Sequence, residues 1–261
     1  MSAPNFVDLE RRDRVAIVTL DRADSLNAIS TQTARELADA CEEITAEKDV
    51  WAVVLRGNGD KAFCVGADLK ERGSFTQEDY FENRTHMRRM FGALRALPQP
   101  SVAAVFGFAL GGGCELALSC DLIVAAEGTQ LGLPETRVGL LPAGGGTQLL
   151  SRRAGLARAK EIILTARRFD AQEGRNIGVV SKVVAHDELD DAALQLARDI
   201  CKGSPVAVRE AKRSLDASLG YPLDEAMEIE NESWRRVITS EDRSEGIAAF
   251  NEKREPKWRN R

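Results

Sequence analysis

The sequence predicts an α/β fold in which buried strands pair mostly parallel and alternate with helices. Three short apolar runs carry this prediction, namely Val15–Leu20, Trp51–Leu55 and Leu122–Ala126. Such runs, rich in β-branched residues and free of charge, are typical of strands covered on both faces of a sheet. Towards the C-terminus the pattern becomes mainly helical. We therefore expect residues 1–190 to form a strand-rich core and residues 191–261 to form a helical region.

The remaining elements follow from capping signals and from the spacing of apolar residues. Ser30 is expected to precede a helix that runs to about Glu47, because apolar residues recur there every three or four positions. Further helices are predicted over Leu149–Leu164, Asp187–Cys201 and Leu223–Val237. Two more strands are expected over Ser101–Phe106 and Val179–Val184.

The composition is that of a globular protein large enough to bury a core without disulfides or metals. Of the 261 residues, 43% are hydrophobic and 30% are charged. The 36 Lys and Arg residues are outnumbered by 41 Asp and Glu residues, which gives a net charge of −5. A dedicated nucleic-acid binder needs a cationic excess to contact phosphates, so a nucleic-acid partner is not expected.

The cysteines and the apolar runs indicate in which cellular compartment the protein is expected. The five cysteines are spread through the chain without a C-x-x-C pair and are interpreted as buried apolar residues under reducing conditions. Residues Met1–Arg14 carry charges and lack an apolar run, so no secretory signal is predicted. The longest charge-free stretch, Pro100–Cys114, is interrupted by glycines and is too short to span a bilayer. We therefore expect a cytoplasmic protein without a membrane partner.

The segment Phe106–Glu115 is the most informative part of the sequence. An apolar run enters a cluster of glycines and continues into a helical pattern. Glycines let the backbone turn sharply and let another molecule approach the amides. A helix start presents free N–H groups and the positive end of the helix dipole, which suits a phosphate or a polarised carbonyl. The segment has neither a G-K-[ST] ending nor G-x-G-x-x-G spacing, so nucleotide binding is disfavoured.

Two acidic residues stand in apolar surroundings, where a charge is costly to bury. Glu115 lies in the first turn of the helix just described, and Glu135 ends the apolar segment Leu131–Glu135. If the two meet in one pocket, their surroundings can give them different protonation states, as one base and one acid require. The alternative for each is a capping or solvated glutamate. Glycine-containing turns at Phe63–Leu69 and Pro142–Thr147 offer further backbone donors for an oxyanion.

Other catalytic patterns are missing from the sequence. The two histidines, His86 and His186, lie in charged contexts without metal-ligand spacing, and there is no G-x-S-x-G or H-E-x-x-H motif. Neither a metal centre nor a Ser–His–Asp triad is therefore expected.

Seven segments resemble the crotonase (enoyl-CoA hydratase/isomerase) superfamily in order and spacing, and the match that they define extends over nearly the whole chain. They are Leu26–Ala28, Ala62–Lys70, Gly107–Glu115, Cys120–Asp121, Leu131–Glu135, Pro142–Thr147 and Phe250–Arg254. The resemblance implies a crotonase-like spiral of ββα units with a helical C-terminal region. It also implies a homo-oligomer, a trimer or a hexamer, with residues 191–261 as the oligomerisation region.

The resemblance further implies an activity and a site. The substrate would be an acyl-CoA whose thioester carbonyl accepts hydrogen bonds from the backbone N–H groups of Ala67 and Gly112, which form an oxyanion hole. Residues expected along the CoA are Ala67, Asp68, Leu69, Lys70, Gly112 and, from the C-terminal region, Lys253. Glutamates at both 115 and 135 favour an enoyl-CoA hydratase, which adds water syn across a 2,3-enoyl-CoA. Glu115 would deprotonate the water that attacks C3, Glu135 would protonate C2, and no cofactor is expected beyond the CoA of the substrate.

Two departures from the family pattern bear on the substrate. Leu133 stands where short-chain hydratases have glutamine, and Ala143 replaces a glycine, so a more apolar pocket wall is expected near Glu135. The string Leu131–Thr136 also resembles the methylglutaconyl-CoA hydratase branch, whose acidic acyl group would need a cation near the pocket. The candidate cations are Arg84, Arg88 and Arg89.

Two alternatives to hydration stay open. One is a Δ3,Δ2-enoyl-CoA isomerase, which product analysis would distinguish from a hydratase. The other is an RNA-binding or scaffold role that uses Arg11–Arg12, Arg84–Arg89 and the basic tail Lys253–Arg261, and the net charge of −5 disfavours it.

Overall fold

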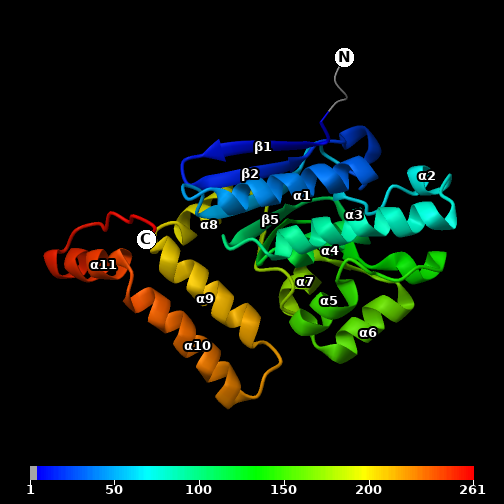
Figure 1. Ribbon diagram of the computed structural model, residues 1–261. Helices are drawn as coiled ribbons and strands as arrows, with labels where there is room; N and C mark the ends of the chain where they lie inside the picture. The colour runs from blue at the N-terminus through cyan, green and yellow to red at the C-terminus, as the bar shows by residue number, and fades with distance from the viewer. Residues whose placement is uncertain (1–4) are drawn as a thin grey trace.

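The computed structural model describes residues 5–261 as two β-sheets surrounded by helices, with a helical arm at the C-terminal end (Figure 1). The larger sheet has the order β1 (Val7–Arg12), β2 (Val15–Leu20), β3 (Ala52–Gly57), β5 (Ser101–Val105), β7 (Leu122–Ala126) and β10 (Lys182–Val184). β1 pairs antiparallel with β2, and every other pair in this sheet is parallel. The mostly parallel pairing predicted from the apolar runs is confirmed.

The smaller sheet consists of very short strands. Its order is β4 (Ala62–Cys64), β6 (Phe108–Leu110), β8 (Gln130–Gly132) and β9 (Arg168–Asp170). β4, β6 and β8 pair parallel, and β9 pairs antiparallel with β8. Three times, a strand of the larger sheet is followed by a strand of the smaller sheet and then by helices, which confirms the predicted spiral of ββα units.

The larger sheet is covered by helices on both faces. On one side lie α1 (Thr31–Ala46), α3 (Gln77–Arg95) and α4 (Gly112–Ser119), and on the other lies α8 (Leu189–Ile200). Along β2, Val18 packs in the cluster with α1, whereas Ile17 packs in the cluster with α8. Because both faces of β2 are buried, its sequence is apolar without alternation. Ser30 caps α1 as predicted, since its side chain accepts the Thr33 N–H.

The helix predicted over Leu149–Leu164 is wrong as a single element. The chain forms α5 (Gly146–Ala154) and α6 (Leu156–Thr165), separated by Gly155. Gly155 has φ of +79°, a left-handed conformation that interrupts an α-helix and that glycine adopts without strain. The apolar periodicity continues across the break and conceals it in the sequence.

Two other predicted elements are shorter in the structure. Of the strand predicted over Val179–Val184, only Lys182–Val184 pairs with β7, because the N–H groups of Val179 and Val180 both donate to the Gly174 carbonyl after α7 (Ala171–Asn176). The segment predicted as helical from Asp187 begins with the 3-10 turn η3 (His186–Glu188) before α8. The remaining short elements are η1 (Ala23–Ser25), α2 (Leu69–Arg72) and η2 (Pro134–Val138).

The C-terminal arm consists of α9 (Pro205–Ser218), α10 (Leu223–Ile238) and α11 (Glu241–Glu252), which extend away from the sheets (Figure 1). α8 packs on the larger sheet through Leu189, Ala193 and Ala197, so the arm begins after α8. Large apolar side chains of the arm are exposed in the single chain. They include Leu215, Leu219, Leu223, Met227, Trp234 and Phe250.

Asn27 connects the loop before α1 to the turn between β3 and β4. Its side-chain amide donates to the carbonyls of Asn58 and Ala62 at 2.9 and 3.0 Å, and its Oδ1 accepts the Arg22 N–H at 2.9 Å. We predict that Asn27→Ala lowers the free energy of unfolding by about 3 kcal/mol, because it leaves these backbone groups without partners. Denaturant unfolding at a fixed protein concentration measures the change. The exposed Asp24→Ala variant is the control, and an equally small effect for both variants would contradict the prediction.

Candidate active site

One cavity of about 440 Å³ brings together the two glutamates and the two backbone donors predicted from the sequence. Glu115, Glu135, Ala67 and Gly112 all contribute to its lining. The two acids come from different ββα units, Glu115 from α4 and Glu135 from η2. The convergence of the two carboxyls, which the sequence left open, is therefore present in the structure.

The backbone nitrogens of Ala67 and Gly112 lie close to each other on the cavity wall. A Cβ atom added to Gly66 would lie 3.0 Å from the Gly112 nitrogen, and one added to Gly112 would lie 3.7 Å from the Ala67 nitrogen. The β-bridge of Ala67 uses the N–H groups of Ile29 and Asp68, and Gly112 is the first residue of α4, so neither element uses the two N–H groups in question. Two such donors at a helix start can stabilise an oxygen that becomes negatively charged.

The Glu115 carboxyl is buried and held by backbone amides. Its side chain belongs to the first turn of α4 and is only 3% exposed. Oε1 accepts the N–H groups of Gly144 and Gly146 at 2.7 and 2.8 Å. Burial raises the pKa of Glu115, while these amides and the charge of Arg84 act in the opposite direction. The hydrogen bonds fix one carboxylate oxygen and leave the other for a ligand.

Two arginines hold the turn that supplies these amides. Arg84 donates to the carbonyl of Ala143 at 2.8 Å, and Arg95 donates to the carbonyl of Gly144 at 2.9 Å. The carbonyl of Ala143 and the N–H of Gly144 belong to one trans peptide unit, so they point in opposite directions. This peptide unit therefore lies between the Arg84 guanidinium and the Glu115 carboxylate, and its dipole is aligned with both charges.

The Glu135 carboxyl has fewer partners. Its Oε2 is buried and has no hydrogen-bond partner among residues 5–261. Burial raises the pKa of Glu135 to about 7, and the nearby Glu115 charge adds to the rise against a hydrogen bond from the residue's own backbone. Gly111, with φ of +53°, permits this placement, because a Cβ there would lie 3.1 Å from Glu135 Oε1. Glu135 thus has fewer hydrogen-bond partners than Glu115 and is also the less buried of the two residues.

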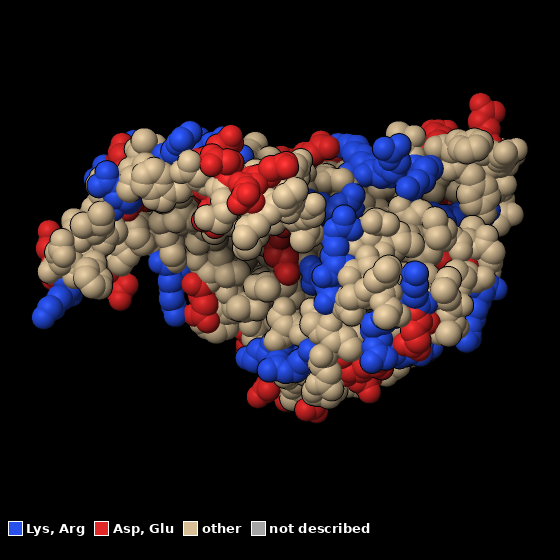
Figure 2. All heavy atoms as spheres, turned by 90° about the horizontal axis from the view of Figure 1, so that it is seen from below, with Lys and Arg blue, Asp and Glu red and all other residues tan. Residues whose placement is uncertain are grey.

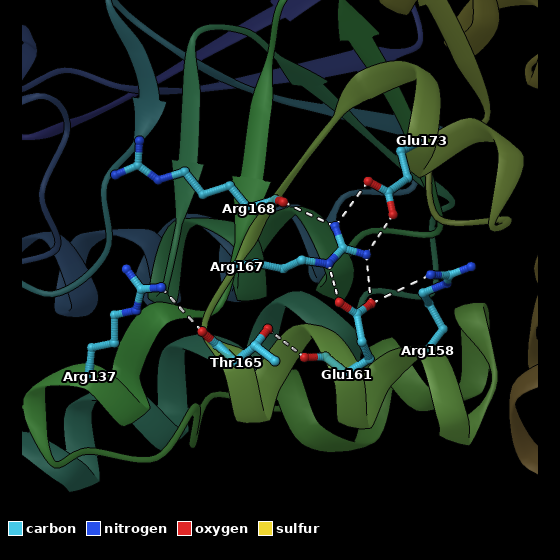
Figure 3. Close-up of polar contacts among 7 residues, drawn as sticks. All are labelled: Arg137, Arg158, Glu161, Thr165, Arg167, Arg168 and Glu173. Carbon is cyan, nitrogen blue, oxygen red and sulfur yellow. Dashed lines mark hydrogen bonds and ion pairs between the residues drawn. The ribbon is translucent and has the colours of Figure 1, made fainter.

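The η2 segment that carries Glu135 is tied to the end of α6. Thr136 Oγ1 donates to the Ile163 carbonyl at 3.2 Å, and Arg137 donates to the Thr165 carbonyl at 3.3 Å. Figure 3 shows the surrounding contacts, in which Arg167 lies between Glu161 of α6 and Glu173 of α7 and donates to both. The position of Glu135 therefore depends on how α6 and α7 are joined.

The other predicted CoA-binding residues are placed as follows. Leu69 lines the cavity and is exposed, whereas Lys70 follows it on α2 outside the lining. The Asp68 carboxylate caps α2 by accepting the N–H groups of Lys70 and Glu71 and pairs with Arg22 at 3.1 Å. Lys253 is the C-cap residue of α11, which lies at the far end of the molecule from α2 (Figure 1). Within one chain, Lys253 is not brought to this cavity.

Of the three arginines predicted as cations near the pocket, only one lines it. Arg84 lines the cavity, Arg89 pairs with Asp39 and Glu42 on α1, and Arg88 lies outside the lining. Arg72 and Arg137 also line the cavity, although neither was among the predicted cations. The run Lys70–Arg72 of alternating charge looks like an exposed helical turn, so no signal in the sequence indicates that Arg72 faces inward.

The cysteines and other potential metal ligands are arranged as follows. All five cysteines are free, and four of them are buried. Within residues 5–261, no group of three or more His, Cys, Asp or Glu side chains is arranged to hold a metal ion. No helix in the same range is long and apolar enough to cross a membrane.

Comparison with known proteins places the chain in a family. A family model described as enoyl-CoA hydratase/isomerase matches residues 10–261. The chain belongs to the enoyl-CoA hydratase/isomerase family. A short-chain-enoyl-CoA hydratase of Clostridium acetobutylicum is 38% identical over 250 residues, 96% of each chain. The mitochondrial methylglutaconyl-CoA hydratase of Mus musculus is 37% identical over 256 residues, which are 96% of this chain and 82% of that protein.

The crotonase fold is matched by solved structures as well. The crystal structure of enoyl-CoA hydratase from Bacillus anthracis superposes with a TM-score of 0.96 at 38% identity and covers 98% of this chain and 100% of that chain. The fold expected from the seven segments is therefore confirmed.

The raised pKa of Glu135 predicts a pH-dependent contribution to stability. Its value of about 7 in the folded protein lies above the ordinary 4.5, so the protein binds a proton on folding between these values and loses stability as the pH rises through them. Glutamine does not titrate. We therefore expect the free energy of unfolding of Glu135→Gln, relative to that of the unmodified chain, to be about 1–3 kcal/mol higher at pH 8 than at pH 5. Denaturant unfolding at both pH values measures this difference, with the exposed Glu127→Gln variant as control. If the stability of Glu135→Gln changed with pH in the same way as that of the unmodified chain, the prediction would be wrong.

Proposed function

We propose that this chain is an enoyl-CoA hydratase, a hydro-lyase that adds water to a 2,3-enoyl-CoA and gives a 3-hydroxyacyl-CoA. The observation that carries the proposal is that two carboxyls, the buried Glu115 and the half-buried Glu135, face one cavity with different hydrogen bonding. Hydration needs a base for the water and an acid for C2, and such a pair can hold the two required protonation states. Membership of the enoyl-CoA hydratase/isomerase family supports it.

In the proposed mechanism, the thioester carbonyl accepts the N–H groups of Ala67 and Gly112. Attack at C3 moves negative charge onto this oxygen as the enolate forms. The two donors and the start of α4 stabilise that charge most strongly in the transition state. An oxyanion-hole donor of this kind is typically worth about 3–4 kcal/mol in the barrier.

The protons are then transferred by the two glutamates. The free oxygen of Glu115 binds the water, takes one of its protons as the water oxygen bonds to C3, and becomes neutral. Glu135 gives its proton to C2 and becomes ionised, and exchange with solvent restores both carboxyls. The active enzyme therefore carries one proton on the pair, and activity falls on the alkaline side when that proton is lost. Both transfers use side chains of this chain, so the proposal calls for no cofactor.

The CoA moiety is proposed to lie along Asp68, Leu69 and Lys70 and to reach the reacting centre at Ala67 and Gly112. Because Lys253 lies far from the cavity of its own chain, its contact with CoA requires a neighbouring subunit. We propose a homo-oligomer, a trimer or hexamer, in which the exposed apolar side chains of the C-terminal arm are covered. The unpaired cysteines suit a reducing compartment, and the proposed location is the cytoplasm.

A nucleic-acid partner is less well supported. Basic side chains form a band on the face seen in Figure 2, but acidic side chains flank it. Six of the arginines that such a role would use are already paired with acids, among them Arg12, Arg259 and Arg261. The other three have two acidic partners each. They are Arg11 with Glu43 and Glu47, Arg89 with Asp39 and Glu42, and Arg254 with Glu245 and Glu252. Ion pairs of this kind reduce the charge available to phosphates.

The proposed function predicts that both glutamates are needed. We expect Glu115→Gln and Glu135→Gln to lower kcat/KM for hydration of crotonyl-CoA by about 10²–10⁴-fold each, because each removes one proton transfer. Loss of the enoyl thioester absorbance measures the rate, and isolation of 3-hydroxybutyryl-CoA identifies the product.

The matched control is Glu127→Gln, an exposed glutamate between β7 and β8, whose rate should equal that of the unmodified chain. Binding of CoA by each variant shows that the site is intact. If the unmodified chain converts 3-enoyl into 2-enoyl thioesters but hydrates neither, the isomerase alternative is correct and the hydratase proposal is wrong.

A further inference from the structure

Helix α5 carries one of the amides that hold the Glu115 carboxylate. Its first residue, Gly146, donates its N–H to Glu115 Oε1 at 2.8 Å. The Leu150 side chain of α5 is fully buried in the core, and those of Leu149 and Ala154 pack against the core partly buried. Because apolar packing is non-directional, the position of the Gly146 donor depends on the polar contacts that α5 makes with α4.

Arg153, in the last turn of α5, makes such a contact with the end of α4. Its Nη2 donates to the carbonyl of Leu118 at 3.1 Å, to that of Cys120, and to that of Asp121 at 3.4 Å. Leu118 belongs to the last turn of α4, and Cys120 is the C-cap residue. The last carbonyls of a helix have no partner within the helix and carry the negative end of its dipole, so a guanidinium satisfies both requirements.

We propose that Arg153 is a positioning residue for the hydration reaction. By holding the C-terminal end of α4, Arg153 fixes α5 against that helix and keeps the Gly146 N–H aligned with the Glu115 carboxylate. This inference rests on the proposed hydratase function. It adds to that site a residue that lies outside the cavity lining.

The spacing of residues along both helices places the two contacts on one seam. Gly146, Leu150 and Arg153 follow one another at intervals of four and three residues, which lie on one face of an α-helix. Glu115 and Leu118 are three residues apart on α4 and likewise share a face. The two helices pack against each other (Figure 1). The start of α5 is thus held by the carboxylate of α4, and the end of α5 holds the end of α4.

The start of α4 is fixed independently of α5. Its N-cap residue Gly111 donates its N–H to the Gly132 carbonyl of β8 at 2.9 Å. Gly113 lies so close to β4 that an added Cβ would be 2.0 Å from the Cys64 carbonyl oxygen. The smaller sheet therefore holds the start of α4. Loss of the Arg153 contact is expected to move α5 and its amide rather than the first turn of α4.

The competing explanation is that Arg153 only stabilises the fold. Loss of its hydrogen bonds would then lower the amount of folded protein and reduce the rate by one factor, with either glutamate or glutamine at position 115. A positioning role acts through the Glu115 carboxylate and disappears when that carboxylate is removed. The two explanations therefore differ in whether the effects of the Arg153 and Glu115 substitutions are additive.

The test is a double-mutant cycle for hydration of crotonyl-CoA, with rates expressed per CoA-binding site. We expect Arg153→Met to lower kcat by about 10–100-fold and to change KM by less than about threefold, because misalignment of the base affects the reaction more than binding. In the Glu115→Gln background, the same substitution should lower kcat by less than about twofold. Arg153→Lys keeps the charge and one donor group and should restore part of the loss.

The matched control is Arg152→Met. Arg152 is exposed on the same helix and donates to Gln148 within α5, so its replacement should leave kcat unchanged.

The pH profile of kcat/KM gives a second readout. The amides of Gly144 and Gly146 favour the ionised form of Glu115, so weakening the Gly146 contact raises the pKa of Glu115. The acid limb of the Arg153→Met profile should therefore lie about 0.5–1 pH unit higher than that of the unmodified chain. Loss of folded protein alone would lower the profile without moving this limb.

The outcomes separate this inference from the function on which it rests. If the unmodified chain does not hydrate crotonyl-CoA, the hydratase function is wrong and the positioning role falls with it. If Arg153→Met lowers kcat by the same factor in both backgrounds and leaves the acid limb in place, the hydratase function stands and the positioning role is wrong. A folded Arg153→Met variant with unchanged kcat also contradicts it. If Arg153→Met does not fold, the same cycle with Arg153→Lys decides by the same criteria.

Discussion

The burial of the Glu115 carboxylate determines how the cavity is built. An ionised or partly ionised acid inside an apolar core needs hydrogen-bond donors, and α4 supplies none beyond its own first turn. The donors come from Gly144 and Gly146, 29 and 31 residues further along the chain. Their turn must approach so closely that a Cβ on Gly144 would lie 2.4 Å from the Phe91 ring. The contacts of Arg84 and α3 with the outside of this turn therefore belong to the same arrangement as the buried acid.

Glu135 differs chemically from Glu115 because no such donors reach its carboxyl. Burial raises the pKa of both glutamates, but only Glu115 is compensated by amides from a separate turn. Glu135 is placed by Gly111 on one side and by the attachment of η2 to α6 on the other. Unequal hydrogen bonding at two desolvated carboxyls is sufficient to separate the protonation states of two identical side chains. Arg167 contributes indirectly, because it joins α7 to α6, the helix to which the segment with Glu135 is attached.

The sequence predicted those parts of the fold that depend on local pattern. The bounds of β2 and β7 agree with their apolar runs, because strands buried on both faces must be continuously apolar. The three-residue strands of the smaller sheet are too short to show a period, and the break at Gly155 falls inside a continuous apolar stripe. The two glutamates were selected because acids in apolar segments are unusual. Arg72 was missed because its orientation is set by packing against α3, which a pattern of charges does not reveal.

The charge balance of the cavity connects these features. When the glutamate pair carries one proton, the cavity holds one negative charge, on Glu115, and the charge of Arg84 is directed to it through the Ala143–Gly144 peptide. Arg72 and Arg137 line the same cavity, and the charges of Glu71 and Glu115 both favour the charged form of Arg72. A further acid in the cavity would place a third carboxyl beside the pair and shift both protonation states. The arginines and a single ionised glutamate therefore keep the protonation states that hydration requires.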